Sequence, residues 1–131
     1  MAKNVVWDGS TDIRMSCNVK FDKIMDRTAK RCANHLTATS PEGLRTGRKY
    51  KYGWTIRKGK QTNNETFIEV WNKTDWQLTW LLENGHIIAN KKGGVGWASA
   101  KPHIQMAIDY VRPQFISEME QAEIEIDFEK G

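Results

Sequence analysis

The sequence lacks long apolar runs, internal repeats and low-complexity segments. A membrane-spanning helix needs about 18 or more consecutive apolar residues, and no such run occurs, so an ordinary transmembrane helix is excluded. Residues Met1 to Ser10 lack the apolar core of a secretory signal, and we therefore expect the protein to remain in the cell that makes it. The 131 residues, 39% hydrophobic and 27% charged, suit a single domain that buries its own core.

Cysteine is scarce. Cys17 and Cys32 fall in or beside the first predicted helix, where their α-carbons would lie roughly 22 Å apart. That separation is too great for a disulfide, so we expect two reduced, partly buried thiols. Neither cysteine has a neighbourhood in the sequence that would favour a reactive thiolate.

Acidic residues are missing from one long segment and concentrated in another. Gly43 to Asn64 contains no acid and seven Lys or Arg residues, whereas residues 118–131 contain six acids and one lysine, a net charge of −5. The remaining 117 residues carry a net charge of +9. This asymmetry favours contact with a polyanion or head-to-tail pairing between copies, and a solvated basic hairpin is the simpler alternative.

The first half of the chain predicts one helix and a hairpin. Residues 1–16 are expected to form an N-terminal arm or a short strand. Apolar residues repeat at helical spacing from Val19 to Thr37, and Ser40-Pro41 then ends the helix. Alternation from Tyr50 to Arg57 predicts a half-buried strand. The stretch Thr66 to Asn72 is apolar on both faces, so we expect it to be the more central partner of an antiparallel pair.

A short tryptophan-rich helix is expected next. Thr74 to Gln77 fits a capping box, and Gly85 stands where a left-handed C-terminal cap belongs. The glycine-rich residues 86–101 are predicted to be a long loop, which in so small a domain is usually functional or ordered by a partner.

The last helix begins at proline. Pro102 suits the first helical position, and Pro113 is expected to kink or split the helix. From Ala122 onward apolar and acidic residues alternate, so residues 123–131 are predicted to form an acidic C-terminal strand or tail. The fold class is therefore α+β: a small antiparallel sheet packed with a long N-terminal helix, a short Trp-rich helix and a C-terminal helix, in one domain of residues 1–131.

Five of the six tryptophans divide into two groups. Trp54, Trp71, Trp76 and Trp80 fall on predicted element faces and are expected to pack in the core. Trp97 lies in the glycine-rich loop, where an exposed aromatic side chain often anchors an interface.

No set of residues predicts a reactive centre. Glu83 and His86 have a Glu-x-x-His spacing used by metal-binding helical bundles, but no second pair exists. Gly94-Val95-Gly96 lacks the Lys-Ser/Thr of a phosphate-binding loop, and no Cys/His spacing matches a zinc site. We therefore expect no enzyme activity, no catalytic, metal-binding or cofactor-binding residue, and no cofactor.

Several short motifs occur in an order found in one protein family. They are Ser40-Pro41, Thr46-Gly47, Tyr50, Gly53-Trp54, Leu81-Leu82-Glu83-Asn84-Gly85-His86 and Lys101-Pro102-His103-Ile104. In this respect the chain resembles the minor structural proteins of long-tailed bacteriophages described as head–tail joining, neck or tail-completion components. The resemblance covers roughly Cys17 to Ala122. Asn84 departs from the aromatic residue frequent in such proteins, and the acidic tail is not a family feature.

The resemblance implies a structural subunit of the phage neck, either a head–tail connector or a tail-completion ring. It would join the DNA-filled capsid to the tail during virion assembly. The implied partners are copies of itself in a homo-oligomeric ring, other neck, connector and tail proteins, and genomic DNA held non-specifically in the lumen, with no membrane. The implied location is the neck or tail end of the virion, and the host cytoplasm during assembly.

Opposite charges on one chain suit a ring of heterologous contacts. We hypothesise that the acidic segment Glu118 to Glu129 of one copy approaches the basic hairpin Arg45 to Lys60 of the next, which would aid register more than affinity. The candidates for contact with a neighbour or with DNA are Arg45, Arg48, Lys49, Lys51, Arg57, Lys58, Lys60, Lys91, Lys92, Trp97, Glu118, Glu120, Glu123, Glu125 and Asp127.

Two other classes of function compete with this one. A small basic nucleic-acid-binding protein would use Tyr50, Tyr52 and Trp54, interleaved with basic residues, to stack on single-stranded bases. A metal-dependent hydrolase would retain metal after purification.

Overall fold

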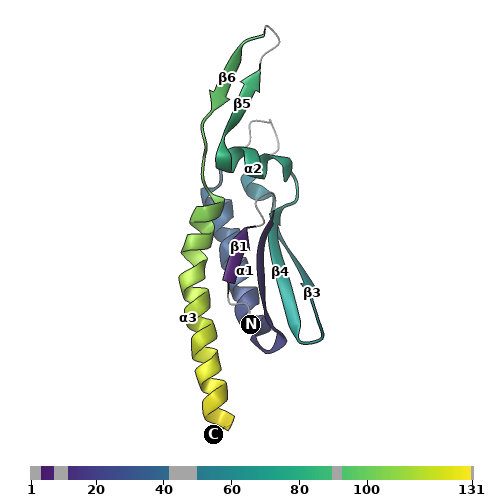
Figure 1. Cartoon of the computed structure of the whole chain (residues 1–131), viewed down its shortest axis with the longest axis vertical. Helices are drawn as coiled ribbons and strands as arrows, with labels where there is room; N and C mark the ends of the chain where they lie inside the picture. The colour runs from purple at the N-terminus through teal and green to yellow at the C-terminus, as the bar shows by residue number, and fades with distance from the viewer. Residues whose placement is uncertain (1–3, 8–11, 42–49, 90–92, 131) are drawn as a thin grey trace.

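The structure is a computed structural model that describes residues 4–7, 12–41, 50–89 and 93–130. As predicted, the fold is α+β (Figure 1). The main sheet is antiparallel, with the spatial order β1 (Asn4–Trp7), β2 (Asp12–Asn18), β4 (Glu65–Asn72) and β3 (Trp54–Lys60). Helices α1 (Asp22–Thr39) and α3 (Ile104–Lys130) pack beside each other against this sheet. None of the helices within the described ranges is long and apolar enough to cross a membrane.

Two strands of the sheet begin within residues 1–16, which were expected to form an arm or a short strand. β1 is a short strand, and β2 continues to Asn18 and pairs with β1 on one side and β4 on the other. Ile13, Met15 and Cys17 alternate with polar residues, the two-residue period of a half-buried strand. The prediction that the strand ending at Asn72 is central is confirmed, because β4 lies between β2 and β3.

One hydrophobic core lies between the sheet and the two helices. Its side chains come from the inner face of the sheet and from helical stripes: Ile13, Met15, Cys17, Phe21, Ile24, Met25, Ala29, Cys32, Leu36, Ile68, Val70, Ile104, Ala107, Ile108, Val111, Phe115 and Met119. Full burial of one large apolar side chain contributes about 1.5–3 kcal/mol, so this cluster holds the helices on the sheet. Both cysteines are buried and unbridged, as expected, although Cys17 lies on β2 and not on a helix.

Tyr50 and the glycine-rich segment differ from their predicted structures. Tyr50 lies in a 3-10 turn, η2 (Tyr50–Tyr52), and the strand begins only at Trp54. The predicted long loop contains a two-stranded antiparallel sheet, β5 (His86–Ala89) and β6 (Val95–Ala98). This hairpin extends from one end of the molecule, next to α2 (Gln77–Asn84) (Figure 1). We call α2 and the hairpin the head, and the sheet with α1 and α3 the body.

The C-terminal segment is helical. α3 starts at Ile104, two residues after Pro102, runs through Pro113 and ends at Lys130, so the predicted split at Pro113 and the predicted acidic strand after Ala122 are wrong. Glu120, Gln121 and Ala122 have high helix propensity and prolong a helix already anchored on the core, which outweighs the alternation that follows.

The ends of α2 also differ in detail from the prediction. Thr74 does not cap the helix, because its hydroxyl donates instead to Asn72 and Asp75, and the N-cap position belongs to Trp76. Gly85 follows the helix with φ 79° and ψ 166°, a positive φ but an extended ψ, so it is not the left-handed cap expected.

Candidate functional site

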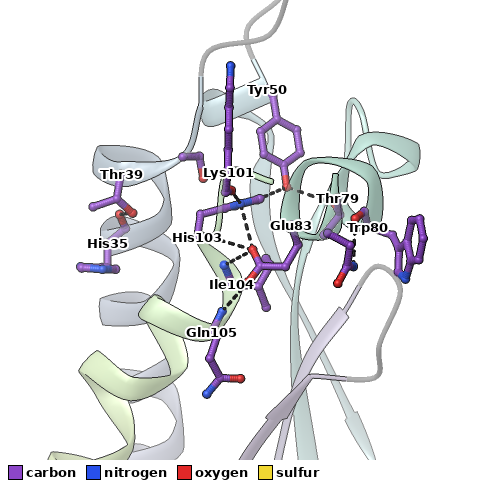
Figure 2. A network of polar contacts seen from close by, with 12 residues as sticks. His35, Thr39, Tyr50, Thr79, Trp80, Glu83, Lys101, His103, Ile104 and Gln105 are labelled. Atoms are coloured by element: carbon purple, nitrogen blue, oxygen red, sulfur yellow. Dashed lines mark hydrogen bonds and ion pairs between the residues drawn. The ribbon is translucent and has the colours of Figure 1, made fainter. Parts of the chain in front are cut away.

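A buried carboxylate joins α2 to the start of α3 (Figure 2). Glu83, in the last turn of α2, is 9% exposed, and its Oε1 accepts hydrogen bonds from the backbone N–H groups of His103 at 2.7 Å and Ile104 at 2.8 Å. Its Oε2 accepts a third from the N–H of Gln105 at 3.2 Å. These donors have no partner within their own helix, and the helix dipole favours negative charge at this end. Glu83 therefore caps α3 from a different helix.

The same contacts fix the charge of Glu83. Burial alone would raise the pKa of its carboxyl, but the hydrogen bonds from the His103 ring and from the three backbone N–H groups outweigh burial and hold the pKa at about 2. Glu83 is therefore ionised at neutral pH, and its preferred form is the one that caps α3.

His103 continues the network toward the sheet. Its Nδ1 lies 2.9 Å from the backbone oxygen of Lys101 and 3.1 Å from Glu83 Oε1, and both oxygens are acceptors, so Nδ1 carries a hydrogen. Its Nε2 lies 2.7 Å from the Tyr50 hydroxyl, which is in turn 3.2 Å from Thr79 Oγ1. All three side chains are buried, so each polar group in this chain of contacts has its partner inside the protein.

A second set of contacts ties Tyr50 to the end of β4. Asn72 Nδ2 donates to the Tyr50 carbonyl at 2.6 Å, and Asn72 Oδ1 accepts from the Asp75 N–H at 2.8 Å. A Cβ at Gly53 would collide with the Thr74 hydroxyl and the Asn72 carboxamide, so only glycine allows this approach. The turn before β3 is thereby fixed against the start of the head.

Most of the motifs quoted for the phage resemblance meet in this region, and Thr46-Gly47 lies outside the described residues. Trp54 Nε1 donates to Ser40 Oγ at 2.8 Å, and the Trp54 ring contacts the Tyr50 ring edge to face at 5.4 Å between centroids. The buried network, as we name it, consists of Ser40, Tyr50, Gly53, Trp54, Asn72, Thr79, Glu83, His103 and Ile104. Its members come from separate parts of the chain, and their contacts join the head to the body.

The chemistry open to this network is limited by burial. Glu83, His103 and Tyr50 are connected in the order carboxylate, imidazole, hydroxyl, as in a nucleophilic triad. However, Tyr50 is 0% and His103 1% exposed, so no substrate reaches the hydroxyl, and burial raises the pKa of Tyr50 well above its usual value. Glu83 pairs with His103, and His86, which shares the Glu-x-x-His spacing that the sequence did not support as a metal site, is described only as part of strand β5.

Two further kinds of reactive centre can be assessed. Burial raises the pKa of the Cys17 thiol to about 11 and that of Cys32 to about 12, so both thiols stay protonated at neutral pH. Among the described residues, no three or more His, Cys, Asp and Glu side chains are grouped so as to hold a metal ion.

The basic candidates are partly engaged within the chain. Arg57 on β3 forms ion pairs with Asp12 at 2.9 Å and Glu69 at 2.8 Å, and Lys58 forms ion pairs with two acids of α1. Lys51 lies over the Tyr52 ring, and Lys60 is exposed at the end of β3. Arg45, Arg48, Lys49, Lys91 and Lys92 lie outside the described residues.

The acidic candidates lie on the C-terminal half of α3. Glu118 forms ion pairs with Arg27 at 3.2 Å and Arg31 at 3.3 Å on α1, so its charge is paired within the chain. Glu120 and Glu125 are exposed, and Glu123 is half-buried. Asp127 lies on α3, in a stretch whose side chains are outside the description.

The tryptophans of α2 were wrongly assigned to the core. Trp76 is 46% and Trp80 48% exposed, because the inward face of α2 is occupied by Thr79 and Glu83 of the buried network. Trp97, predicted to anchor an interface, lies on β6 and is 62% exposed. Thr79 and Glu83 each follow one of these tryptophans by three residues, so the two pairs are neighbours on the helix surface, and burial of Thr79 and Glu83 leaves Trp76 and Trp80 beside the buried side chains.

Comparisons with known proteins found no match: no family model, no curated protein and no solved structure is similar to this chain.

Proposed function

We propose that this chain is a structural subunit of the neck of a long-tailed bacteriophage, either a head–tail connector or a tail-completion ring. In this role it joins the DNA-filled capsid to the tail as one member of a homo-oligomeric ring. It works in the virion and in the host cytoplasm during assembly, without a cofactor and without catalysing a reaction.

The observation that carries the proposal is the buried network. Most of its residues, including Glu83, His103 and Tyr50, belong to the motifs that suggest the phage family, and they meet in an inaccessible region whose contacts shape the fold. The residues of an active site would instead converge on an accessible surface. The burial of the network residues supports an assembly role, because a structural subunit depends on a fixed position of the head relative to the body.

The proposal is tested in the phage that encodes the chain. Removal of the protein by a nonsense mutation should leave DNA-filled heads and free tails that fail to join, visible by electron microscopy. Supplying the wild-type chain in trans should restore joined particles, and the chain should be present in density at the neck. Infectious particles that form normally when the protein is not made would overturn the proposal. Wild-type particles whose neck does not contain the protein would also overturn it.

Charge reversal gives a second test. Reversal of Lys58 would also break its ion pairs with Asp22 and Asp26, so it does not isolate a contact with a neighbour. Lys60→Glu is the cleaner variant, because Lys60 is exposed and forms no ion pair with any residue that the structure describes. If the basic hairpin meets the acidic segment of the next copy, this variant lowers the yield of joined particles without lowering the stability of the subunit.

The structure exposes little of the aromatic surface that the competing nucleic-acid-binding function would need for base stacking. Tyr50 is fully buried and Trp54 is packed against the core, so of the three proposed stacking residues only Tyr52, 66% exposed, is available. Salt-dependent binding of single-stranded DNA by the purified protein would nevertheless favour that function over the structural one.

A further inference from the structure

Helix α2 buries polar side chains and leaves large aromatic side chains half exposed, unlike an ordinary surface helix. Its fully buried side chains are polar, Thr79 and Glu83, whereas Trp76 and Trp80 project from it and are about half exposed. These two tryptophans are four residues apart and so lie on the same face. Glu83 is the one ionisable residue of α2, which leaves the outer face without charge. An uncharged surface of large aromatic side chains is typical of a protein interface.

We infer that the outer face of α2, carrying Trp76 and Trp80, binds the C-terminal segment of α3, centred on Ile124, of a second copy of this chain. This inference rests on the homo-oligomeric ring of the proposed function, and it names the head, in place of the basic hairpin of residues 45–60, as the surface that the acidic segment of another copy meets. The contact is heterologous: the head of one copy holds the tail helix of the next.

The tail helix has the properties that the aromatic face requires. Ile124 is 62% exposed, and it lies between the exposed acids Glu120 and Glu125. The head offers the opposite charge, because the exposed Lys73 and Lys101 flank it in sequence and neither is ion paired with a described residue. An apolar side chain between acids therefore complements an uncharged aromatic face whose flanking sequence positions carry lysines.

The two surfaces cannot meet within one molecule. The Ile104 amide is bonded to Glu83 of α2, and Ile124 is 20 residues further along α3, which corresponds to about 30 Å of helix. Figure 1 shows the head and the end of α3 at opposite ends of the chain. A contact between complementary surfaces at opposite ends links copies in series, which closes into a ring or continues as a filament.

The experiment uses purified full-length chain in sedimentation velocity over a wide range of concentrations. The head variant is Trp76→Ser with Trp80→Ser, the tail variant is Ile124→Glu, and the matched control is Met106→Ser, which removes an apolar side chain 57% exposed elsewhere on α3. Circular dichroism and thermal unfolding establish that each variant is folded. We expect the wild type and the control to self-associate and each of the two other variants to remain monomeric.

Mixing the head and tail variants is the decisive step. Each retains one intact surface, so a heterologous contact predicts a 1:1 dimer that grows no further. The inference is overturned if the wild type is monomeric, if either variant associates like the wild type, if the control also loses association, or if the mixture stays monomeric. A monomeric wild type whose loss still blocks head–tail joining would reject this contact alone and leave the proposed function standing.

Exchange of the charges tests whether the lysines of the head pair with the acids of the tail helix or whether association is non-specific. Lys73→Glu with Lys101→Glu should weaken association of the otherwise wild-type chain at least several-fold. Mixing this variant with Glu120→Lys/Glu125→Lys should restore association between the two. Absence of both effects would contradict the charge complementarity on which the choice of partner rests.

Discussion

The carboxylate of Glu83 joins the head to the body, and it belongs both to a motif of the phage resemblance and to the buried network that supports the proposed function. It belongs to α2 in the head, yet it satisfies three backbone donors at the start of α3 in the body. Its Oε1 also lies 3.1 Å from the His103 ring nitrogen that carries a hydrogen. Charge-assisted hydrogen bonds of this kind are stronger than neutral ones, and leaving such buried donors unpaired is costly.

Glu83→Gln should therefore lower the free energy of unfolding by about 2–3 kcal/mol. The substitution removes the charge and turns an amide N–H₂ group toward backbone donors that need an acceptor. Urea unfolding at neutral pH measures the change. Glu120→Gln is the matched control, because Glu120 is exposed on α3, and its effect should stay within about 0.5 kcal/mol. Equal effects of the two substitutions would contradict the capping role.

The low pKa of Glu83 also predicts how stability depends on pH. The folded-state pKa is about 2 against an ordinary value of 4.5, so the unfolded chain takes up the proton first as the pH falls. The contribution of Glu83 is therefore complete above about pH 5 and is lost progressively from there toward the folded pKa, at about 1.4 kcal/mol per pKa unit. The difference in unfolding free energy between wild type and Glu83→Gln should shrink between about pH 5 and pH 3. A constant difference across that window would show that the charge of Glu83 is not responsible.

At the scale of the elements, the connection after α2 depends on a glycine. Gly85 has φ 79°, and a Cβ there would lie 2.8 Å from the Ala98 carbonyl oxygen and 3.0 Å from the Trp97 ring. Its N–H donates to the Leu81 carbonyl at 2.8 Å, which ends the helix. Gly85 thus lets the chain leave α2 and pass closely along β6.

Gly85→Ala should destabilise the protein by about 2 kcal/mol or more, because backbone collision adds to the cost of a positive φ. Gly93→Ala is a matched control: Gly93 has φ 81°, but no atom lies within 4 Å of its added Cβ. Its cost should be no more than about 1–2 kcal/mol. Thermal unfolding of both variants checks the order, and a larger effect at Gly93 would show that the collision at Gly85 is unimportant.

Sequence patterns predicted the elements that had strong periodicity. They were less successful where contacts between residues far apart in the sequence determine the secondary structure. The stripe from Phe21 to Leu36 gave the first helix, because helical spacing and core burial agree. Residues 1–16 were predicted only as an arm or a short strand although Ile13, Met15 and Cys17 alternate with polar residues, because the local sequence does not show that β2 pairs with β4. The period of two after Ala122 misled for the opposite reason, since an established helix extends through it.

The site was predictable only in part for a similar reason. The motifs containing Glu83 and His103 were recognised, but nothing in the sequence indicated a contact between these two residues, which are 20 positions apart. Capping of one helix by a side chain from another is a tertiary contact, and spacing along the chain does not encode it. The same contact turned Trp76 and Trp80 outward, which no periodicity argument anticipated.

At the scale of the whole molecule, the body and the head differ in how they are held. The body has one core in which β4 is paired on both edges and covered by α1. The hairpin of β5 and β6 forms a separate two-stranded sheet that extends from the body (Figure 1). A two-stranded sheet is marginally stable by itself, so its ladder should open without global unfolding.

Hydrogen–deuterium exchange measured by mass spectrometry should therefore show two levels of protection. Amides of β4 should exchange only through global unfolding, whereas those of β5 and β6 should exchange orders of magnitude faster in the monomer. In assembled particles the hairpin should gain protection, because a ring subunit that presents Trp97 to a neighbour buries this strand pair in the interface. A hairpin as protected as β4 in the monomer would show that head and body open as one unit. A hairpin that stays unprotected after assembly would exclude it from the contacts that hold the ring together.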